Sequence, residues 1–363
     1  MAKVSIAKCN SYSEKQVQKA VEKAVGELGG IKSFVKKGQK VLLKTNLLSA
    51  KKPEEAVTTH PAIVKAVAML CKKAGAKVFI GDSPAEKDFL KAAESAGIAK
   101  VCKQAGAKLV ELSNPVDRKS KNAFAAESLK VSAKLGEFDA IINLPKLKTH
   151  VFTGYTGAVK NLYGCVPGKI KGSYHLKFPS PDSFSKMLLD LHSIVKPRLS
   201  IMDAVVGMEG EGPSAGKPKK IGLVIASESA FALDFIALKA VGIKPAKIPT
   251  AGLAQRFGLE DYSKIELCGD SVELPFVKGF KPSKAFNYGI GALKAITKHF
   301  RKIFGKKPSI INEKCIACGK CFETCPADAI VYFEGKKPEF DYKACIRCFC
   351  CMEICPQKAI EAK

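Results

Sequence analysis

Two stretches of the sequence decide the fold of its C-terminal part: CIACGKCFETCP at residues 315–326 and CIRCFCCMEICP at residues 345–356. In both, three cysteines are separated by two residues each, and a fourth follows three residues later, directly before a proline. Nine of the 14 cysteines of this 363-residue chain lie within residues 315–355. Such clustering without an export signal indicates metal ligands rather than a disulfide scaffold.

The spacing C-x₂-C-x₂-C-x₃-C-P, present twice, predicts two [4Fe–4S] clusters. Structural zinc is the alternative, but zinc sites have longer gaps between their cysteine pairs. The fourth cysteine of each run is expected to bind the cluster of the other run. We therefore expect cluster I to be bound by Cys315, Cys318, Cys321 and Cys355, and cluster II by Cys345, Cys348, Cys351 and Cys325. Cys350 is an additional thiol to which we assign no ligand role.

Residues 308–363 are thus predicted to form a small α+β ferredoxin module of the bacterial type, with a hairpin between the two runs. It carries eight Lys or Arg and eight Asp or Glu. Clusters of this type transfer single electrons, and two of them form a relay. A ferredoxin module fused to a larger domain is expected to deliver electrons to that domain or to remove them from it.

Residues 1–275 alternate short apolar runs with helical patterns, which predicts an α/β domain. The apolar runs do not alternate strictly with polar residues, as expected for strands buried on both faces. We therefore predict a mostly parallel sheet with helices on both faces. The expected strands contain residues 41–43, 78–80, 140–142, 201–202 and 223–225; the expected helices include one that begins at Pro61 and ends before Gly75, and others over 184–195 and 231–241.

The segment 276–307 contains nine Lys or Arg and no acidic residue. Apolar residues recur in it at helical spacing, from Ile290 to Phe304, with basic residues between them. We expect a basic amphipathic linker or helix. It either packs on its own protein or lies on a membrane surface.

The formal net charge is +26. Besides a generally Lys-rich surface, this charge fits an acidic electron-carrier partner, a small anionic substrate or nonspecific polyanion binding. The sequence contains no helix-turn-helix, RNP or zinc-finger pattern, so we expect no sequence-specific nucleic-acid binding. It contains neither a signal peptide nor an apolar run of membrane-spanning length. The expected location is therefore the cytoplasm.

Polar side chains follow several of the predicted strands, where ligands bind in open α/β sheets. Among them are candidates for binding a substrate or an additional, unidentified cofactor: Lys44, Asn46, Asp82, Ser83, Lys146, Gly157 and Asp203. Asp82 and Asp203 are expected to orient bases or bind a cation. Gly157 is expected to let backbone N–H groups approach an anion.

A second group of residues suggests chemistry on an anion. Lys148 and Lys160, with Lys146, predict an electropositive pocket for a carboxylate or phosphate. His150 and His175 are candidates for proton transfer at neutral pH. Cys165 is a candidate nucleophile or thiolate ligand, because a Lys-rich pocket is expected to lower its pKa; the alternative is a small buried side chain in a Gly-rich turn.

Residues 143–168, NLPKLKTHVFTGYTGAVKNLYGCVPG, closely resemble the DUF362 family, a widespread group of uncharacterised proteins often fused to ferredoxin modules. The resemblance extends over about residues 35–270 and implies no particular reaction. Residues 154–160, GYTGAVK, with Pro167-Gly168 are more distantly similar to the N-domain of nickel-pincer lactate racemases. In that family the lysine tethers the cofactor, so the similarity implies a tethered cofactor at Lys160. The interval from this lysine to Pro-Gly is longer here.

Two classes of function remain open. In the first, the protein is an oxidoreductase whose clusters exchange electrons with an anionic substrate near Lys148, His150 and Lys160. In the second, it is an electron-transfer or binding subunit with no chemistry of its own. No nucleotide-binding glycine loop and no Ser-His-Asp order is present to decide between them.

Overall fold

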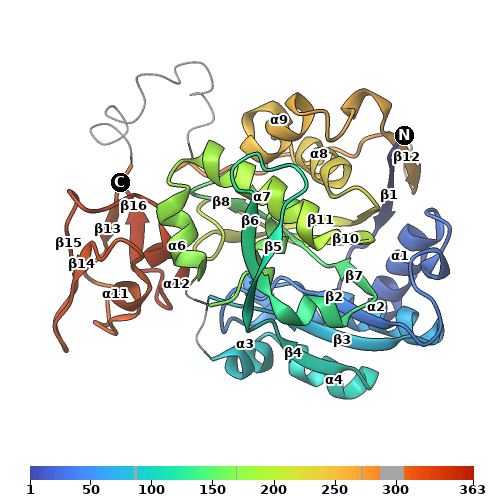
Figure 1. Cartoon of the computed structure of the whole chain (residues 1–363), viewed down its shortest axis with the longest axis horizontal. Helices are drawn as coiled ribbons and strands as arrows, with labels where there is room; N and C mark the ends of the chain where they lie inside the picture. Colours follow the sequence, from blue (N-terminus) through green and yellow to red (C-terminus); the bar gives the residue numbers. More distant parts are fainter. Residues whose placement is uncertain (86–87, 169, 271–272, 287–305) are drawn as a thin grey trace.

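The computed structural model describes residues 1–85, 88–168, 170–270, 273–286 and 306–363. They form a large α/β domain and a small C-terminal module, which lies against one end of it (Figure 1). Most of the predicted amphipathic linker lies outside the described residues, since 287–305 are not among them. The residues at its beginning pack on the large domain: the Glu211 carboxylate accepts hydrogen bonds from the Ser283 hydroxyl (2.6 Å) and the Lys284 backbone N–H (2.7 Å).

Within the described residues, one sheet of ten strands organises the large domain. Its main path has the order β12-β1-β11-β10-β7-β2-β3-β4, and β8 joins β9 to the edge of β10. The pairs from β10 through β7, β2 and β3 to β4 are parallel, whereas β11 is antiparallel to both neighbours. The strands are β1 (Lys3–Lys8), β2 (Lys40–Lys44), β3 (Lys77–Asp82), β4 (Lys108–Glu111), β7 (Ala140–Asn143), β8 (Lys146–His150), β9 (Gly154–Thr156), β10 (Leu199–Glu209), β11 (Lys217–Ser227) and β12 (Glu266–Gly269). The expected mostly parallel sheet is confirmed, and all five predicted strands lie in it.

Two layers of helices cover this sheet, as predicted. The apolar side chains of β2 explain why: Val41 and Leu43 belong to one buried core, and Leu42 belongs to the other. The first core is completed by α1 (Glu14–Gly26), α2 (Pro61–Lys73), α3 (Phe89–Ser95) and α4 (Ile98–Ala105). The second is completed by α5 (Ala158–Asn161), α6 (Ile170–Lys177), α7 (Pro181–Val195), α8 (Ala230–Ala240) and α9 (Pro249–Arg256).

Smaller elements connect these layers. A separate antiparallel hairpin is formed by β5 (Pro115–Lys119) and β6 (Ser128–Ser132). Short 3₁₀ turns are η1 (Ile31–Ser33), η2 (Pro53–Glu55), η3 (Ala133–Glu137), η4 (Leu162–Cys165), η5 (Pro245–Lys247) and η6 (Tyr262–Lys264). No helix among the described residues combines the length and the apolar character needed to cross a membrane.

The C-terminal module consists of two antiparallel strand pairs and two short helices. β13 (Pro308–Ile310) pairs with β16 (Ile360–Ala362), and β14 (Ile330–Val331) pairs with β15 (Glu339–Phe340) to form the predicted hairpin. The helices are α11 (Lys320–Thr324) and α12 (Cys350–Ile354). This is the expected small α+β arrangement.

Helix α12 and the turn after it dock the module onto the large domain. Met352 shares a buried apolar group with Val151, which follows β8. The Ser214 hydroxyl donates to the Met352 carbonyl (3.4 Å), and the Lys51 amine donates to the Pro356 carbonyl (3.1 Å). The second cysteine run therefore packs on the large domain, and Pro326 at the end of the first run also lies close to Gly172 of α6.

Candidate redox and anion site

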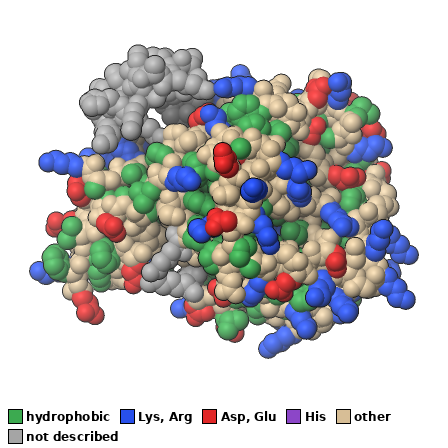
Figure 2. Space-filling view, viewed as in Figure 1, with side chains coloured by type: hydrophobic (Ala, Val, Ile, Leu, Met, Phe, Trp, Pro, Cys, Tyr) green, Lys and Arg blue, Asp and Glu red, His purple; other side chains and the backbone are tan. Residues whose placement is uncertain are grey.

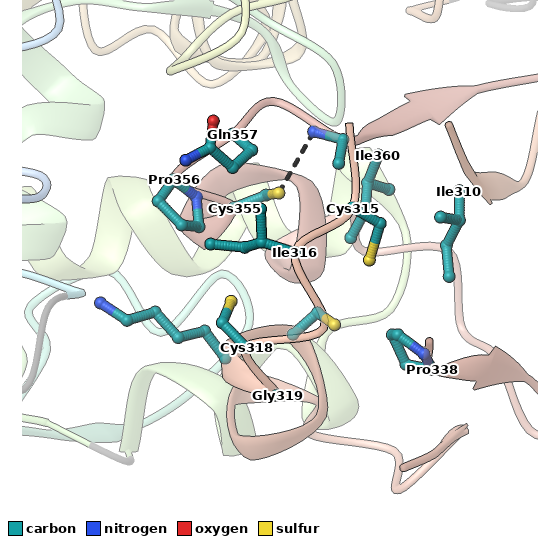
Figure 3. Close-up of a pocket in the computed structure, with 13 residues that line it drawn as sticks. Ile310, Cys315, Ile316, Cys318, Gly319, Pro338, Cys355, Pro356, Gln357 and Ile360 are labelled. Atoms are coloured by element: carbon teal, nitrogen blue, oxygen red, sulfur yellow. Dashed lines mark hydrogen bonds between the residues drawn. The ribbon is translucent and has the colours of Figure 1, made fainter. Parts of the chain in front are cut away.

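The eight predicted cluster ligands surround two cavities in the module. Cavity I is lined by Cys315, Cys318, Cys321 and Cys355, together with apolar side chains such as Ile316. Figure 3 shows Cys315, Cys318 and Cys355 around this cavity. The Ala359 N–H donates to the Cys355 sulfur at 3.2 Å. Cavity II is lined by Cys325, Cys345, Cys348 and Cys351. This grouping is the one that the cross-ligation pattern predicts.

The module is built as an internal repeat with an offset of 30 residues. Backbones at equivalent positions adopt the same left-handed conformation: φ is 52° at Ala317 and 56° at Arg347, and 47° at Asp328 and 50° at Lys358. The Ala329 N–H donates to the Cys325 sulfur at 3.3 Å, matching the bond of Ala359 to Cys355. Four sulfurs around an apolar cavity, with a backbone N–H directed at one of them, fit a [4Fe–4S] cube.

Strand β8 carries a row of buried basic side chains toward the module. Lys146, Lys148 and His150 alternate along the strand and therefore share one face of it. All three are at most 1% exposed. Because unpaired buried cations are costly, each has to be matched by a partner on an adjacent element.

At the first position of the row, Lys146 is fully compensated. Its amine lies 2.8 Å from an Asp203 oxygen and 2.8 Å from the Tyr12 hydroxyl. Tyr12 in turn donates to the other Asp203 oxygen (2.8 Å), and the His60 backbone N–H also donates to Asp203 (2.9 Å). The carboxylate of Asp203 thus binds groups of the protein itself.

At the second position, Lys148 is held by neutral acceptors. Its amine donates to the Asn46 side-chain oxygen and to the Val57 carbonyl, both at 2.7 Å. The Asn46 amide donates to Asn161 (2.8 Å), the residue after Lys160. Burial, followed by the nearby charge of Lys160, lowers the pKa of Lys148 to about 7. Neither acceptor of the Lys148 amine is a carboxylate, so no negative charge of a described residue lies at hydrogen-bonding distance to balance it.

At the third position, His150 contacts Glu353 of the C-terminal module. Its Nδ1 accepts the Phe152 backbone N–H (3.0 Å), which places the ring proton of a neutral imidazole on Nε2. Nε2 lies 3.1 Å from Oε1 of Glu353 in α12, although the two groups are not aligned as a hydrogen bond. Burial, together with the charge of Lys160, lowers the pKa of His150 to about 4.

His175 and Lys160 complete this group. The His175 ring stacks on Phe184 with centroids 4.5 Å apart, and burial lowers its pKa to about 3. Lys160 is half-buried. Its amine lies 5.9 Å from the centre of the Tyr163 ring and makes no hydrogen bond or ion pair with any described residue. Burial lowers the pKa of Lys160, and the charge of Glu353 opposes this effect.

Several buried polar atoms in this region lack a hydrogen bond to any described residue. They are His150 Nε2, His175 Nδ1, Glu353 Oε1 and the hydroxyl of Thr156, which pairs with Lys148 across β8 and β9. Buried polar atoms are normally bonded, so a group of unbonded ones indicates a place for a ligand or water. We call the group formed by Lys160, His150, His175 and Glu353 the interdomain site.

The short helix that carries Lys160 is held by a buried carboxylate. Asp234 of α8 accepts the backbone N–H groups of Ala158 (2.6 Å) and Val159 (3.0 Å). A side chain at Gly157 would lie 2.1 Å from an Asp234 oxygen, so only glycine fits there. Gly157 thus lets the backbone approach a carboxyl group of the protein itself, that of Asp234, whose pKa burial raises to about 7.

Lys44, Asp82, Ser83 and Cys165 form a second buried group, apart from the interdomain site. The Lys44 amine pairs with Asp82 at 2.9 Å, and the Ser83 hydroxyl accepts from the Lys171 amine at 3.0 Å. The prediction of a lowered pKa for Cys165 is wrong. Its thiol is fully buried, and burial outweighs the charge of Lys44 and raises its pKa to about 12.

The structure therefore brings together four of the five candidate catalytic residues, Lys148, His150, Lys160 and His175, and separates Cys165 from them. Sequence reasoning missed Glu353, Asp234 and Tyr12. The acid at position 353 also occurs 30 residues earlier, as Glu323, and this repetition within the cysteine runs is the only signal in the sequence that draws attention to it.

Comparison with known proteins agrees with this two-part organisation. Residues 41–239 match the model of a domain of unknown function, DUF362, and residues 307–356 match that of a 4Fe-4S dicluster domain. The chain belongs to the DUF362 family. A thylakoid-associated protein, sll1697, from Synechocystis is 35% identical to it over 316 residues, which cover 84% of this chain and 96% of that protein. The C-terminal module is accordingly an iron–sulfur domain.

Among solved structures, similarity is weak. The lactate racemase apoprotein from Thermoanaerobacterium thermosaccharolyticum aligns with 13% identity and a TM-score of 0.45, covering 66% of this chain and 58% of that chain. A protein from Thermotoga maritima aligns with 14% identity and a TM-score of 0.39, covering 69% and 60%. Less than two thirds of either solved chain is covered, and no function is transferred from them.

Proposed function

We propose that this protein is an iron–sulfur oxidoreductase that exchanges electrons between a protein partner and a small anionic substrate. The eight cysteines around cavities I and II hold clusters I and II, and the substrate binds at the interdomain site. When bound, the clusters supply single-electron transfer. The observation that carries the proposal is the group of buried, unbonded polar atoms that the two domains contribute beside α12.

The proposed anion is recognised by hydrogen-bond donors. The Lys160 ammonium makes no bond within the described chain, and the His150 Nε2–H is directed toward the same region. Charge-assisted hydrogen bonds of this kind are favoured by carboxylates and phosphates. His175, with its unbonded Nδ1, is placed to form a hydrogen bond with the substrate. Because burial lowers its pKa to about 3, it stays neutral at neutral pH, which argues against its predicted role in proton transfer.

The burial of the cysteines suggests the order of electron transfer. Cys318 at cavity I is exposed, whereas Cys348 and Cys351 at cavity II are buried, and α12 beside them faces the large domain. In our proposal an external partner therefore exchanges electrons with cluster I, and cluster II exchanges them with the interdomain site.

Ligand-induced stabilisation tests the anion site. Anaerobically prepared, cluster-loaded protein is melted with inorganic phosphate and with a panel of two- to four-carbon carboxylates. A ligand at 100 times its Kd is expected to stabilise the fold by about 2.7 kcal/mol. Lys160→Ala should abolish this shift, whereas Lys186→Ala, which removes a lysine paired with Asp182 on α7, should retain it. An equal shift in Lys160→Ala and the wild type would refute the anion site.

A second candidate is an electron-transfer or binding subunit without chemistry of its own. The pairs Lys44–Asp82 and Lys146–Asp203 favour it, because these buried charges already satisfy each other. In that case Lys160→Ala leaves all electron-transfer rates unchanged.

A tethered cofactor at Lys160 is the remaining alternative. The unpaired amine with a lowered pKa fits an attachment point. Denaturing mass spectrometry tests it: an added mass on the peptide that contains Lys160 supports the tether, and an unmodified lysine in active protein contradicts it.

We keep the cytoplasm as the proposed location. The alternative is peripheral association with a membrane, which the name of the Synechocystis relative suggests. The net charge of +26 would favour binding to anionic lipids. Flotation with anionic vesicles distinguishes the two: protein that floats at physiological salt contradicts a purely cytoplasmic location.

A further inference from the structure

The internal repeat of the module makes its two halves comparable residue by residue. With an offset of 30, Ile316 corresponds to Ile346, Phe322 to Met352 and Glu323 to Glu353. The matched left-handed residues and the matched N–H···S bonds show that the equivalence holds in three dimensions. Any difference in exposure between equivalent residues therefore reports what covers each half.

The second half is covered by the large domain. Met352 is only 4% exposed and shares a buried apolar group with Val151. Glu353, the next residue, reaches His150 at 3.1 Å. This face of the second half thus combines one apolar contact with one polar contact.

The equivalent face of the first half is open. Phe322 is 44% exposed and Ile316, which lines cavity I, is 60% exposed. Five of the ten large apolar side chains that are exposed among the described residues lie in this small module. Figure 2 also shows hydrophobic side chains on the outer part of the module. Exposed apolar side chains gathered in this way mark interaction surfaces.

We propose that the face formed by Phe322 and Glu323 is the docking surface for an acidic one-electron carrier protein. The carrier would lie beside cluster I in the same way as the large domain lies beside cluster II. This inference rests on the proposed relay, whose external partner it specifies. In each encounter the reduced carrier loses one electron and cluster I gains it, with no bond made or broken.

Long-range electrostatic steering supports an acidic carrier. The chain has a formal net charge of +26, all of it outside residues 308–363, and this charge attracts acidic proteins over long range and speeds their association at low salt. The local apolar patch is small, as is typical of brief redox encounters. We therefore expect fast, weak and salt-sensitive docking.

The surface is tested by measuring, in a stopped-flow instrument, the rate at which a reduced, acidic plant-type [2Fe–2S] ferredoxin transfers electrons to the full-length, cluster-loaded protein. Phe322→Glu places a negative charge on the patch, and Phe322→Ala removes the aromatic ring from it. Both should slow the second-order rate, the first by about tenfold or more. The matched control is Met69→Glu on α2, where the side chain is 48% exposed and far from the module in sequence. It should leave the rate unchanged. Reduction by methyl viologen needs no docking and should be equal in all variants.

The outcomes separate this inference from the proposed function. Unchanged carrier rates in both patch variants, or an equal loss in Met69→Glu, would overturn the docking surface. So would a parallel loss of the viologen rate, because the substitution would then have altered cluster I itself. If carrier rates fall as expected but Lys160→Ala has no effect on anion binding, the docking surface stands and the substrate site is wrong.

Discussion

Glu353→Gln tests the structural connection between the module and the large domain. The substitution keeps the shape of the side chain and removes its charge beside His150 Nε2, 3.1 Å away in the structure. The contact is a close approach of a charge to a buried polar N–H group, and removing the partner of a buried polar group costs about 1–3 kcal/mol. The Lys160 ammonium also loses a favourable neighbour, whose charge raises its pKa. We expect a loss of about 2 kcal/mol in the free energy of unfolding.

The assay is anaerobic urea unfolding of cluster-loaded protein, followed at two wavelengths that report the clusters and the backbone separately. The matched control is Glu334→Gln, because Glu334 is an exposed carboxylate of the same module, between β14 and β15. Surface substitutions of this kind change stability by about 0.5 kcal/mol or less. Equal stability of the two variants would refute the claim that Glu353 connects the domains.

Three further predictions concern the large domain. Anion affinity should fall as pH rises through about 7, because burial and the charge of Lys160 lower the pKa of Lys148 to that value and its positive charge is lost there. In Lys148→Met, anion affinities measured by calorimetry between pH 6 and 8 should depend little on pH. A steep pH dependence that remains in this variant would exclude Lys148 as its cause. Cys165 should resist iodoacetamide at pH 8 in the folded protein, since burial raises its pKa to about 12; rapid alkylation seen by mass spectrometry would contradict its burial. Asp234→Ala should leave two buried backbone N–H groups without an acceptor, which lowers the free energy of unfolding by about 1–3 kcal/mol for each. It should also weaken anion binding, because α5 and with it Lys160 are displaced. Full anion affinity in a folded variant would show that Asp234 does not position α5.

The sequence was sufficient for the parts of the fold that are governed by local patterns. Apolar runs such as 41–43 predict buried strands, because a side chain buried on either face of a sheet has to be apolar. The cysteine runs predict two four-cysteine cavities, because ligand geometry restricts the spacing within each loop.

The composition of the interdomain site depends on contacts that no local pattern specifies. His150 and Glu353 are 203 positions apart, and only the docking of α12 brings them together. The error at Cys165 has a related cause, since the sequence shows that lysines are near but not that the thiol is fully buried. Likewise, Gly157 indicates a close approach of the backbone to an anion, but the group that it approaches, the carboxyl of Asp234, lies on another helix.

Iron and sulfide analysis of anaerobically purified protein, together with native mass spectrometry, tests the central claim most directly. The account predicts about eight iron and eight sulfide per chain, falling to about four of each when the cysteines of one cavity are replaced. Zinc bound in place of iron after strictly anaerobic preparation, or one cluster per chain in the wild type, would contradict a two-cluster relay.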